Sequence, residues 1–301
     1  MIQYRSHAWF RLLFSRRGSS SRGVLGRVLL FGAVGMGVAV LHRLGAAVHL
    51  PAGVHETGGA LIALVLAFRV NTAYNRFWEG RSLWGAIVNH GRNLGRMVPR
   101  FAKLDASETR AFRSWIVVFA HAARRRLRGE SGLPEVERLL TPEEFEALLA
   151  APHPPLHAAD ELTRRLEELL SQGRIDPTLA TWAERLVAAL VDALGGCERI
   201  HKTPTPLVIV LLIERFIALY LATMPFMLVT RVDDLVPVVT MLIAYPVVLI
   251  DALAADLDDP FGHDPSDLPL TRICLTIERD LLGSEPSPEL LYAGATAAPE
   301  D

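Results

Sequence analysis

Apolar residues are gathered into long blocks along this chain. Charge-free runs occupy residues 28–41, 57–68, 203–213, 216–230 and 235–250. None reaches the roughly 18 apolar residues that identify a lipid-spanning helix by length alone, and runs of about 10 to 14 also occur in buried helices of soluble proteins. With flanking small residues and an occasional charge turned toward other helices, the blocks reach spanning length. The pattern predicts four membrane helices, at about 24–46, 50–74, 207–230 and 235–256.

Three prolines favour the membrane interpretation over a buried soluble core. Pro225, Pro237 and Pro246 lie inside or at the start of the last two blocks. Proline is tolerated better in membrane helices, because neighbouring helices and polar side chains satisfy the backbone groups that it frees.

The distribution of basic residues predicts an orientation. Residues 1–27 hold six arginines and no acid, and residues 69–128 hold thirteen Lys or Arg against three acids. The short links 42–56 and 231–234 hold one arginine each. Basic residues are enriched on the cytoplasmic side of a membrane. We therefore expect a multi-pass protein of the inner (plasma) membrane, with both termini and residues 75–206 in the cytoplasm.

The middle of the chain is typical of soluble helices. Apolar residues recur at the helical spacing, in three series: Trp84, Ile87, Val88, Gly91, Leu94 and Val98; Leu162, Leu166, Leu169 and Leu170; and Trp182, Leu186, Ala189, Leu190 and Leu194. Thr141 followed by Pro142 and two acids predicts a helix start, whereas Pro152, Pro154 and Pro155 predict a loop. We expect one domain over residues 1–280 and a mobile tail over 281–301.

Composition narrows the possible functions. Half of the residues are hydrophobic, 21% are charged and the mean hydropathy is +0.27, which excludes disorder and is too apolar for a typical soluble enzyme. The formal net charge of −2 gives no support to nucleic-acid binding. The two cysteines, Cys197 and Cys274, lie too far apart in sequence for a redox or zinc motif. No phosphate-binding loop or hydrolase motif occurs, so we do not expect an enzyme.

Three motifs together resemble one family. They read NTAYNRFWEGRSLWG at 71–85 with RNL at 92–94, CERIHKTPTPL at 197–207 and DDPFGHDPSDLPL at 258–270. In this order and at this spacing they resemble the bestrophin family, including its bacterial branch, over roughly residues 1–280. The resemblance implies an all-α homopentamer in the lipid membrane, in which five subunits with four membrane helices and a cytosolic helical region each surround one axial pore.

The activity implied by the resemblance is passive conduction of small monovalent ions, with chloride as the default. Some bacterial members resemble cation channels, and this sequence does not decide between the two. A non-conducting membrane-anchored scaffold of the same fold is a further alternative. A secondary transporter fits less well, because four spans without an inverted repeat are few for that architecture.

The pore residues that the resemblance implies lie in the second membrane helix and before the third. Ala60, Leu64 and Phe68 are spaced by four and share one helix face, and they match the hydrophobic neck of the family. Rings of these residues would gate by expelling water, although the same spacing also fits simple packing in a bundle. Thr205 matches the cytosolic constriction, where many relatives carry a branched aliphatic residue. A threonine ring is expected to be wetter.

Several charged residues lie near these positions in the sequence. Arg69 favours anions if it faces the pore and says little if it faces the protein. We expect Arg76 with Glu79, and Trp78 with Arg81, to be helix neighbours. Structural packing and ion pairing are the roles expected for a larger set: Arg76, Trp78, Glu79, Arg81, Trp84, Arg92, Glu198, Arg199 and His201. Glu214 and Arg215 lie inside the third span, and their partners are expected within the bundle.

An acidic segment follows the fourth predicted span. It contains Asp256, Asp258, Asp259, Asp264 and Asp267, and carboxylates are the ligands that calcium prefers. In animal bestrophins the matching segment binds calcium. Here His263, Pro265 and Ser266 stand among the acids, which leaves Asp264 and Asp267, with Asp256, as candidate ligands for Ca²⁺ or another divalent cation. The alternative is a solvated acidic loop over 256–267.

Overall fold

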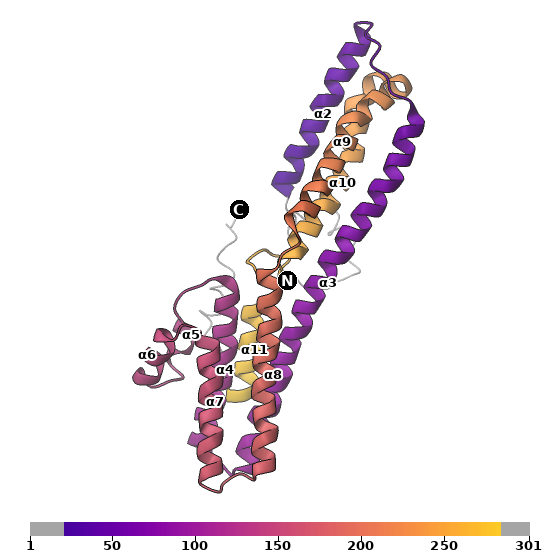
Figure 1. Ribbon diagram of the computed structural model, residues 1–301. Helices are drawn as coiled ribbons and strands as arrows, with labels where there is room; N and C mark the ends of the chain where they lie inside the picture. The colour runs from indigo at the N-terminus through magenta and orange to yellow at the C-terminus, as the bar shows by residue number, and fades with distance from the viewer. Residues whose placement is uncertain (1–20, 284–301) are drawn as a thin grey trace. The chain divides into compact units, whose positions relative to one another are not determined.

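The computed structural model describes residues 21–283 as helices joined by short loops (Figure 1). No strand occurs in this part of the chain, and the expected all-α class is confirmed for it. The helices are α2 Ser21–Arg43, α3 Ala52–Phe101, α4 Ala106–Arg128, α5 Pro134–Glu137, α6 Pro142–Ala150, α7 Pro154–Ser171, α8 Pro177–Lys202, α9 Leu207–Val232, the 3-10 turn η1 Asp233–Leu235, α10 Val236–Asp258 and α11 Leu270–Leu282. Arg5, Arg11, Arg16 and Arg17 of the basic N-terminus, and most of the predicted tail, lie outside the described residues.

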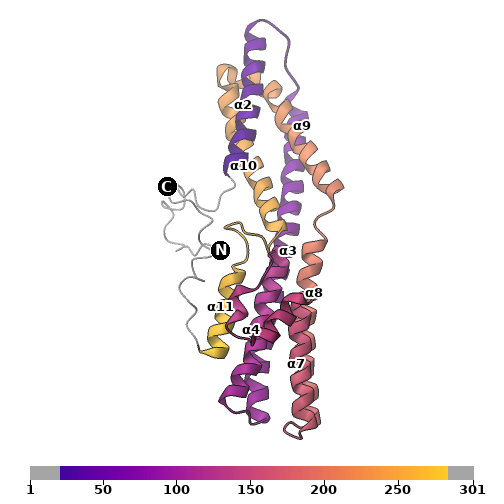
Figure 2. The same cartoon turned by 90° about the vertical axis from the view of Figure 1, so that its left-hand side faces the viewer.

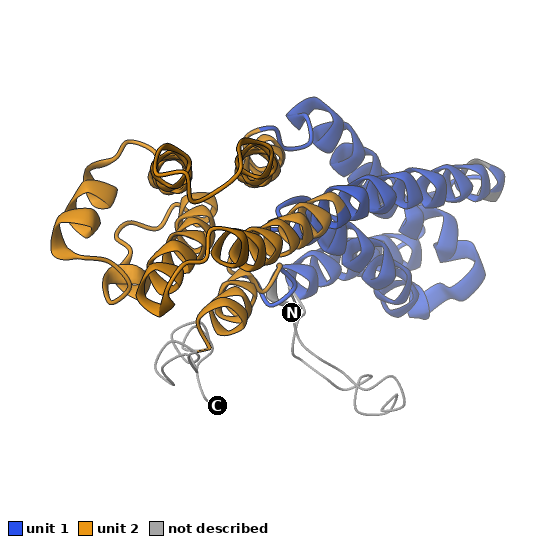
Figure 3. Cartoon of the chain, turned by 90° about the horizontal axis from the view of Figure 1, so that it is seen from below, with its two compact units in different colours: residues 1–78, 203–260, 264–267 blue, residues 79–202, 261–263, 268–301 orange. Residues whose placement is uncertain are grey.

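The chain divides into two compact units (Figure 3). Unit 1 contains residues 1–78, 203–260 and 264–267, and unit 2 contains residues 79–202, 261–263 and 268–301. The predicted neck, the predicted constriction and the acids at 256–259, 264 and 267 all belong to unit 1.

Unit 1 is built from α2, the first part of α3, α9 and α10, which run alongside one another in both Figure 1 and Figure 2. Helix α2 packs on α10 and α9, which also contact each other. Glycines allow α2 and α10 to approach closely: a Cβ at Gly35 would lie 3.1 Å from the Pro237 Cα. Small residues serve this purpose in membrane helix pairs. The core contains Val28, Val38, Ile62, Leu66, Leu221 and Val248.

Three helical stretches of the described residues are long and apolar enough to cross a bilayer. They are Gly23–Arg43, His55–Phe101 and Leu207–Asp258. The last stretch includes α9, η1 and α10. Helix α9 has 26 residues and α10 has 23, so each is longer than the roughly 30 Å hydrocarbon core at 1.5 Å per residue.

Unit 2 is organised around α4, whose residues 114–124 are all buried. Helices α7, α8 and α11 pack on it. The predicted helix start at Thr141 is confirmed, because its hydroxyl caps α6 and Glu144 completes the capping box.

Two details of the predicted unit 2 helices are wrong. The structure begins α7 at Pro154, where a loop was expected, because proline is compatible with the first turn of a helix. Trp182 was placed on the apolar face of α8 but is 57% exposed. The face that packs inward carries Ala183, Val187, Leu190 and Leu194.

Candidate functional site

The residues predicted to form the neck lie on an exposed face of α3. Leu64 is 53% exposed and Phe68 is 63% exposed, and Ala60 is exposed as well. On the opposite face of the helix, Ile62 and Leu66 are buried in the unit 1 core. The chain therefore covers one side of α3 with its own helices and leaves the stripe of Ala60, Leu64 and Phe68 open.

An apolar groove lies beside this stripe in unit 1. Its volume is about 700 Å³. Small residues of α3, namely Gly59, Ala63 and Ala67, line it together with apolar side chains of α10 and Tyr220 of α9. A single chain therefore has two uncovered apolar surfaces on the same helix.

Four charged side chains meet inside unit 1, one from each of its long helices. Asp251 of α10 lies 2.7 Å from an Arg69 guanidinium nitrogen of α3 and 3.2 Å from one of Arg27 of α2. Glu214 of α9 lies 3.9 Å from both arginines. We call this group the quartet; it contains Arg27, Arg69, Glu214 and Asp251. Its two positive and two negative charges give a net charge of zero, and such pairing lowers the cost of placing charges in a low dielectric.

The quartet decides which way Arg69 faces. The Arg69 side chain is only 11% exposed and the Asp251 side chain 3%, so Arg69 faces the protein and its charge is compensated there. Glu214 has partners within the bundle, as expected. Arg215 is exposed, and no partner for it occurs among residues 21–283.

Thr205 is hydrogen-bonded to Asp258, one of the acids in the segment that follows the fourth predicted span. The Thr205 hydroxyl donates a 2.6 Å hydrogen bond to Asp258 Oδ1. Arg76 Nε lies 2.9 Å from the same oxygen, and Arg76 also donates to the Thr203 carbonyl oxygen at 2.8 Å. These contacts join the start of α9 to the end of α10. Because the hydroxyl hydrogen is engaged, it is not free to donate elsewhere.

The predicted cation site is not assembled as a ligand set. Asp267 is buried, and its carboxylate accepts a 2.7 Å hydrogen bond from the Asp264 backbone N–H. No group of three His, Cys, Asp or Glu side chains within residues 21–283 is placed to hold a metal ion. Asp256, Asp264 and Asp267 therefore do not converge as expected, because the Asp267 carboxylate closes a local turn.

The charged residues of the block at 76–92 have mostly long-range partners. Glu79 pairs with Arg199 of α8 at 2.5 Å, and Arg92 pairs with Asp280 of α11. The expected Arg76–Glu79 pair is therefore wrong, since tertiary partners replace the helix neighbour. Trp84 is fully buried, but Trp78 is 58% exposed, so packing explains only one of these tryptophans within a single chain.

Glu198 joins three basic groups within unit 2. It lies 2.5 Å from Arg126, 3.0 Å from His153 and 3.1 Å from Lys202. Burial raises the pKa of this carboxyl, but the hydrogen bonds from Arg126 and Lys202 prevail and lower it to about 2. His153 Nδ1 accepts the Leu156 backbone N–H at the start of α7, which leaves Nε2 to donate to Glu198.

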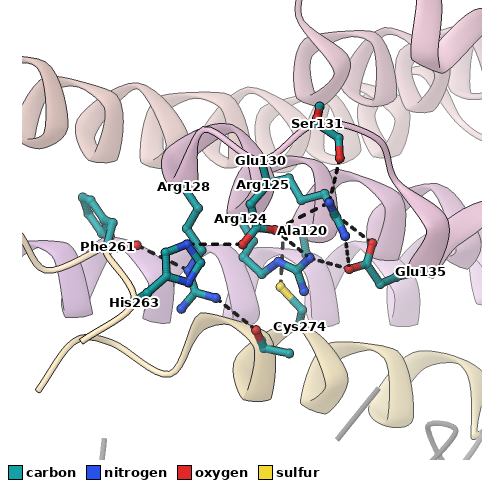
Figure 4. A network of polar contacts seen from close by, with 11 residues as sticks. Ala120, Arg124, Arg125, Arg128, Glu130, Ser131, Glu135, Phe261, His263 and Cys274 are labelled. Carbon is teal, nitrogen blue, oxygen red and sulfur yellow. Dashed lines mark hydrogen bonds and ion pairs between the residues drawn. The ribbon is translucent and has the colours of Figure 1, made fainter. Parts of the chain in front are cut away.

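A second network in unit 2 surrounds the C-terminal end of α4 (Figure 4). Glu135 of α5 accepts hydrogen bonds from Arg124 at 2.6 Å and Arg125 at 2.7 Å. His263 lies 3.5 Å from Glu130, and Cys274 Sγ donates to the Ala120 carbonyl oxygen. Burial raises the pKa of Glu135, but the two arginines prevail and lower it to about 2.

This depressed pKa predicts an acid-sensitive contribution of Glu135 to stability. The folded-state pKa of about 2 lies below the ordinary value of 4.5, so the contribution is present at neutral pH and is lost as the pH falls from 4.5 toward 2. Glu135→Gln is expected to lower the unfolding temperature at pH 7, and the difference from wild type should shrink below about pH 4. Tryptophan fluorescence melts of detergent-solubilised protein measure this.

The matched control is Glu146→Gln, which changes an exposed acid on α6. It should leave the melting curve close to wild type at both pH values. A Glu135→Gln difference that is the same at pH 7 and pH 3.5 would contradict the assignment, because the change would then act through packing alone.

The sequence matches known proteins over almost its whole length. The pattern of the bacterial and fungal bestrophin proteins matches residues 1–283. A voltage-dependent anion channel-forming protein of Nostoc sp. is 34% identical over 277 residues, covering 91% of this chain and 90% of the relative. The voltage-dependent anion channel-forming protein YneE of Escherichia coli K12 is 32% identical over 288 residues, covering 94% and 93%.

The fold has solved relatives as well. The crystal structure of a point mutant of a bacterial bestrophin homologue from Klebsiella pneumoniae superposes with a TM-score of 0.81 at 30% sequence identity. The match covers 86% of this chain and 98% of the Klebsiella chain. Sequence and fold agree, and the protein belongs to the bacterial and fungal bestrophin family.

Proposed function

We propose that this protein is a homopentameric channel that conducts small monovalent anions, chloride among them, passively across the inner membrane. Five copies of α3 would surround one axial pore. Ala60, Leu64 and Phe68 would form three apolar rings in its neck, and Thr205 would form a constriction at the cytosolic exit. No catalytic step is required for this function.

The observation that carries the proposal is the open stripe on α3. A large apolar side chain such as Phe68, 63% exposed on a helix whose other face is buried, has to meet lipid, another copy or a pore. The adjoining groove of about 700 Å³ offers a surface for a neighbouring subunit. With neighbours against the groove, the stripe would be left to face the axis.

The proposed topology has four crossings, by α2, the first part of α3, α9 and α10, with both termini in the cytoplasm. The arginine-rich residues 1–27 support this orientation. The quartet is consistent with this packing, because its two buried charges, Arg69 and Asp251, are paired with each other, and paired charges cost less in a low dielectric than single ones.

Anion preference is supported by the names of the relatives, which are anion channel-forming proteins. Within the chain, Arg69 is compensated and does not provide it. The start of α9 beside Thr205 supplies backbone N–H groups and a positive dipole end, which favour anions.

The reversal potential of purified protein in planar bilayers under a KCl gradient tests this function. A potential near the chloride equilibrium value is the expected result. A potential near the potassium value would instead establish a cation channel of the same fold. No current from the wild type or from a Leu64→Ala, Phe68→Ala variant would leave a non-conducting scaffold as the better interpretation.

A further inference from the structure

We propose that Asn71 and Asn75 form two rings of amide hydrogen-bond donors at the inner end of the neck, which receive the anion as it leaves the apolar rings. This inference rests on the proposed function, since it uses the same pore. In this arrangement, two uncharged side chains of α3 contribute to the ion selectivity of the pore.

Helix geometry places the two asparagines in line with the neck. Seven residues make almost two full turns of an α-helix, and both pairs, Leu64 with Asn71 and Phe68 with Asn75, are seven residues apart within the single helix α3. At 1.5 Å per residue, Asn71 lies about 4.5 Å and Asn75 about 10.5 Å below Phe68 along the helix axis. If the stripe lines the pore, Asn75 follows it directly, and Asn71, which also lines the groove, lies at the edge between the stripe and the groove.

The two amides are available for an ion. Asn71 and Asn75 are both exposed, and neither side chain makes a hydrogen bond to any residue in the range 21–283 that the structure describes. Their polar neighbours are already engaged: the Thr72 hydroxyl donates to the Phe68 carbonyl oxygen at 2.9 Å, and Arg76 is held by Asp258 at 2.9 Å.

The chemistry of the amide fits this role. A primary amide offers two N–H donors and one acceptor oxygen. An anion in a narrow apolar tube has lost part of its hydration, and N–H donors at the end of that tube replace water ligands without a fixed charge that would bind the ion too tightly to leave. Two successive rings allow the ion to pass from one to the next.

Removing the donors should therefore change which anions pass most easily. Strongly hydrated chloride depends on replacement donors more than weakly hydrated iodide does. In Asn71→Ala and Asn75→Ala, the iodide-to-chloride permeability ratio is expected to rise by roughly threefold or more, the effect of about one net hydrogen bond. Asn71→Ser and Asn75→Ser are close in size to the alanine variants but keep a hydrogen-bond donor. Their permeability ratios should stay closer to that of the wild type.

Bi-ionic reversal potentials of purified protein in planar bilayers measure these ratios. Thr72→Ala is the control, because its hydroxyl is bound to the helix backbone, and its ratio should equal that of wild type. As an independent check, Asn71→Asp and Asn75→Asp replace the donors by a carboxylate of nearly the same shape. They should shift the reversal potential in a KCl gradient toward the potassium value.

The outcomes separate this inference from the function on which it rests. Alanine variants with a wild-type ratio, or serine variants that shift as much as the alanine ones, would overturn the amide rings while leaving an anion channel in place. Aspartate variants with an unchanged reversal potential would also overturn them. A wild-type protein without anion-selective current would reject the proposed function itself.

Discussion

Replacing Leu64 and Phe68 together by alanine is expected to raise the single-channel conductance by about tenfold or more. In the proposed pore these side chains form two of three apolar rings, and a narrow apolar tube expels water and makes an ion shed its hydration. Smaller side chains admit water, and lowering the barrier by about 1.4 kcal/mol already gives a factor of ten. Single-channel recording in planar bilayers measures the change.

Leu242→Ala is the matched control for this experiment. Leu242 of α10 is 72% exposed, comparable to the neck residues, but it does not lie on α3. Its removal should leave the conductance at the wild-type level. If the double variant conducts no better than wild type, or if Leu242→Ala has the same effect, the neck lies elsewhere.

Asp251→Ala is expected to destabilise unit 1 by about 3–5 kcal/mol, the usual cost of removing one partner of a buried ion pair. The Arg69 guanidinium, 11% exposed, loses its 2.7 Å partner. Glu214, at 3.9 Å, is then the one remaining acid of the quartet for both arginines. Thermal unfolding of the detergent-solubilised protein should show a clear fall in midpoint.

Two controls separate this charge effect from lost packing. Replacing Arg69 and Asp251 together by leucine should recover most of the stability, because a buried pair can often be exchanged for apolar residues at little cost. Asp234→Ala breaks a pair with Arg43 in which both side chains are more than 60% exposed, and it should leave the unfolding midpoint close to that of the wild type. A double leucine variant as unstable as Asp251→Ala would contradict the charge explanation.

Helical spacing in the sequence predicted the helices well. It did not predict which face of each helix is covered, because tertiary packing determines that. Spacing by four identified Ala60, Leu64 and Phe68 as one face of a helix, and the structure leaves that face open in the single chain. Whether it lines a pore stays a prediction. In α8 the same reasoning placed Trp182 inside, because an aromatic ring at helical spacing looks like core, but Ala183 and Val187 are the buried residues.

Long-range polar partners were beyond the reach of sequence spacing. Glu214 and Asp251 could not be matched to Arg27 and Arg69 from neighbours along the chain, because each of the four predicted spans contains two charged residues and their spacing does not show which of them meet. Asp258 was grouped with nearby acids because it is adjacent to them in sequence. In the fold, the end of α10 brings it to Thr205 instead.

The quartet also sets an order of events during synthesis. Arg27 precedes Asp251 by 224 residues, which at the usual rate of about 5–20 residues per second corresponds to roughly 10–45 s of translation. For most of that interval the nascent α2 and α3 carry arginines whose carboxylate partners, Glu214 and Asp251, have not yet been made. Water or lipid phosphates must solvate these guanidinium groups near the membrane surface until α9 and α10 emerge. The ion pairs of Asp251 can therefore form only after α10, the last long helix of unit 1, has been made.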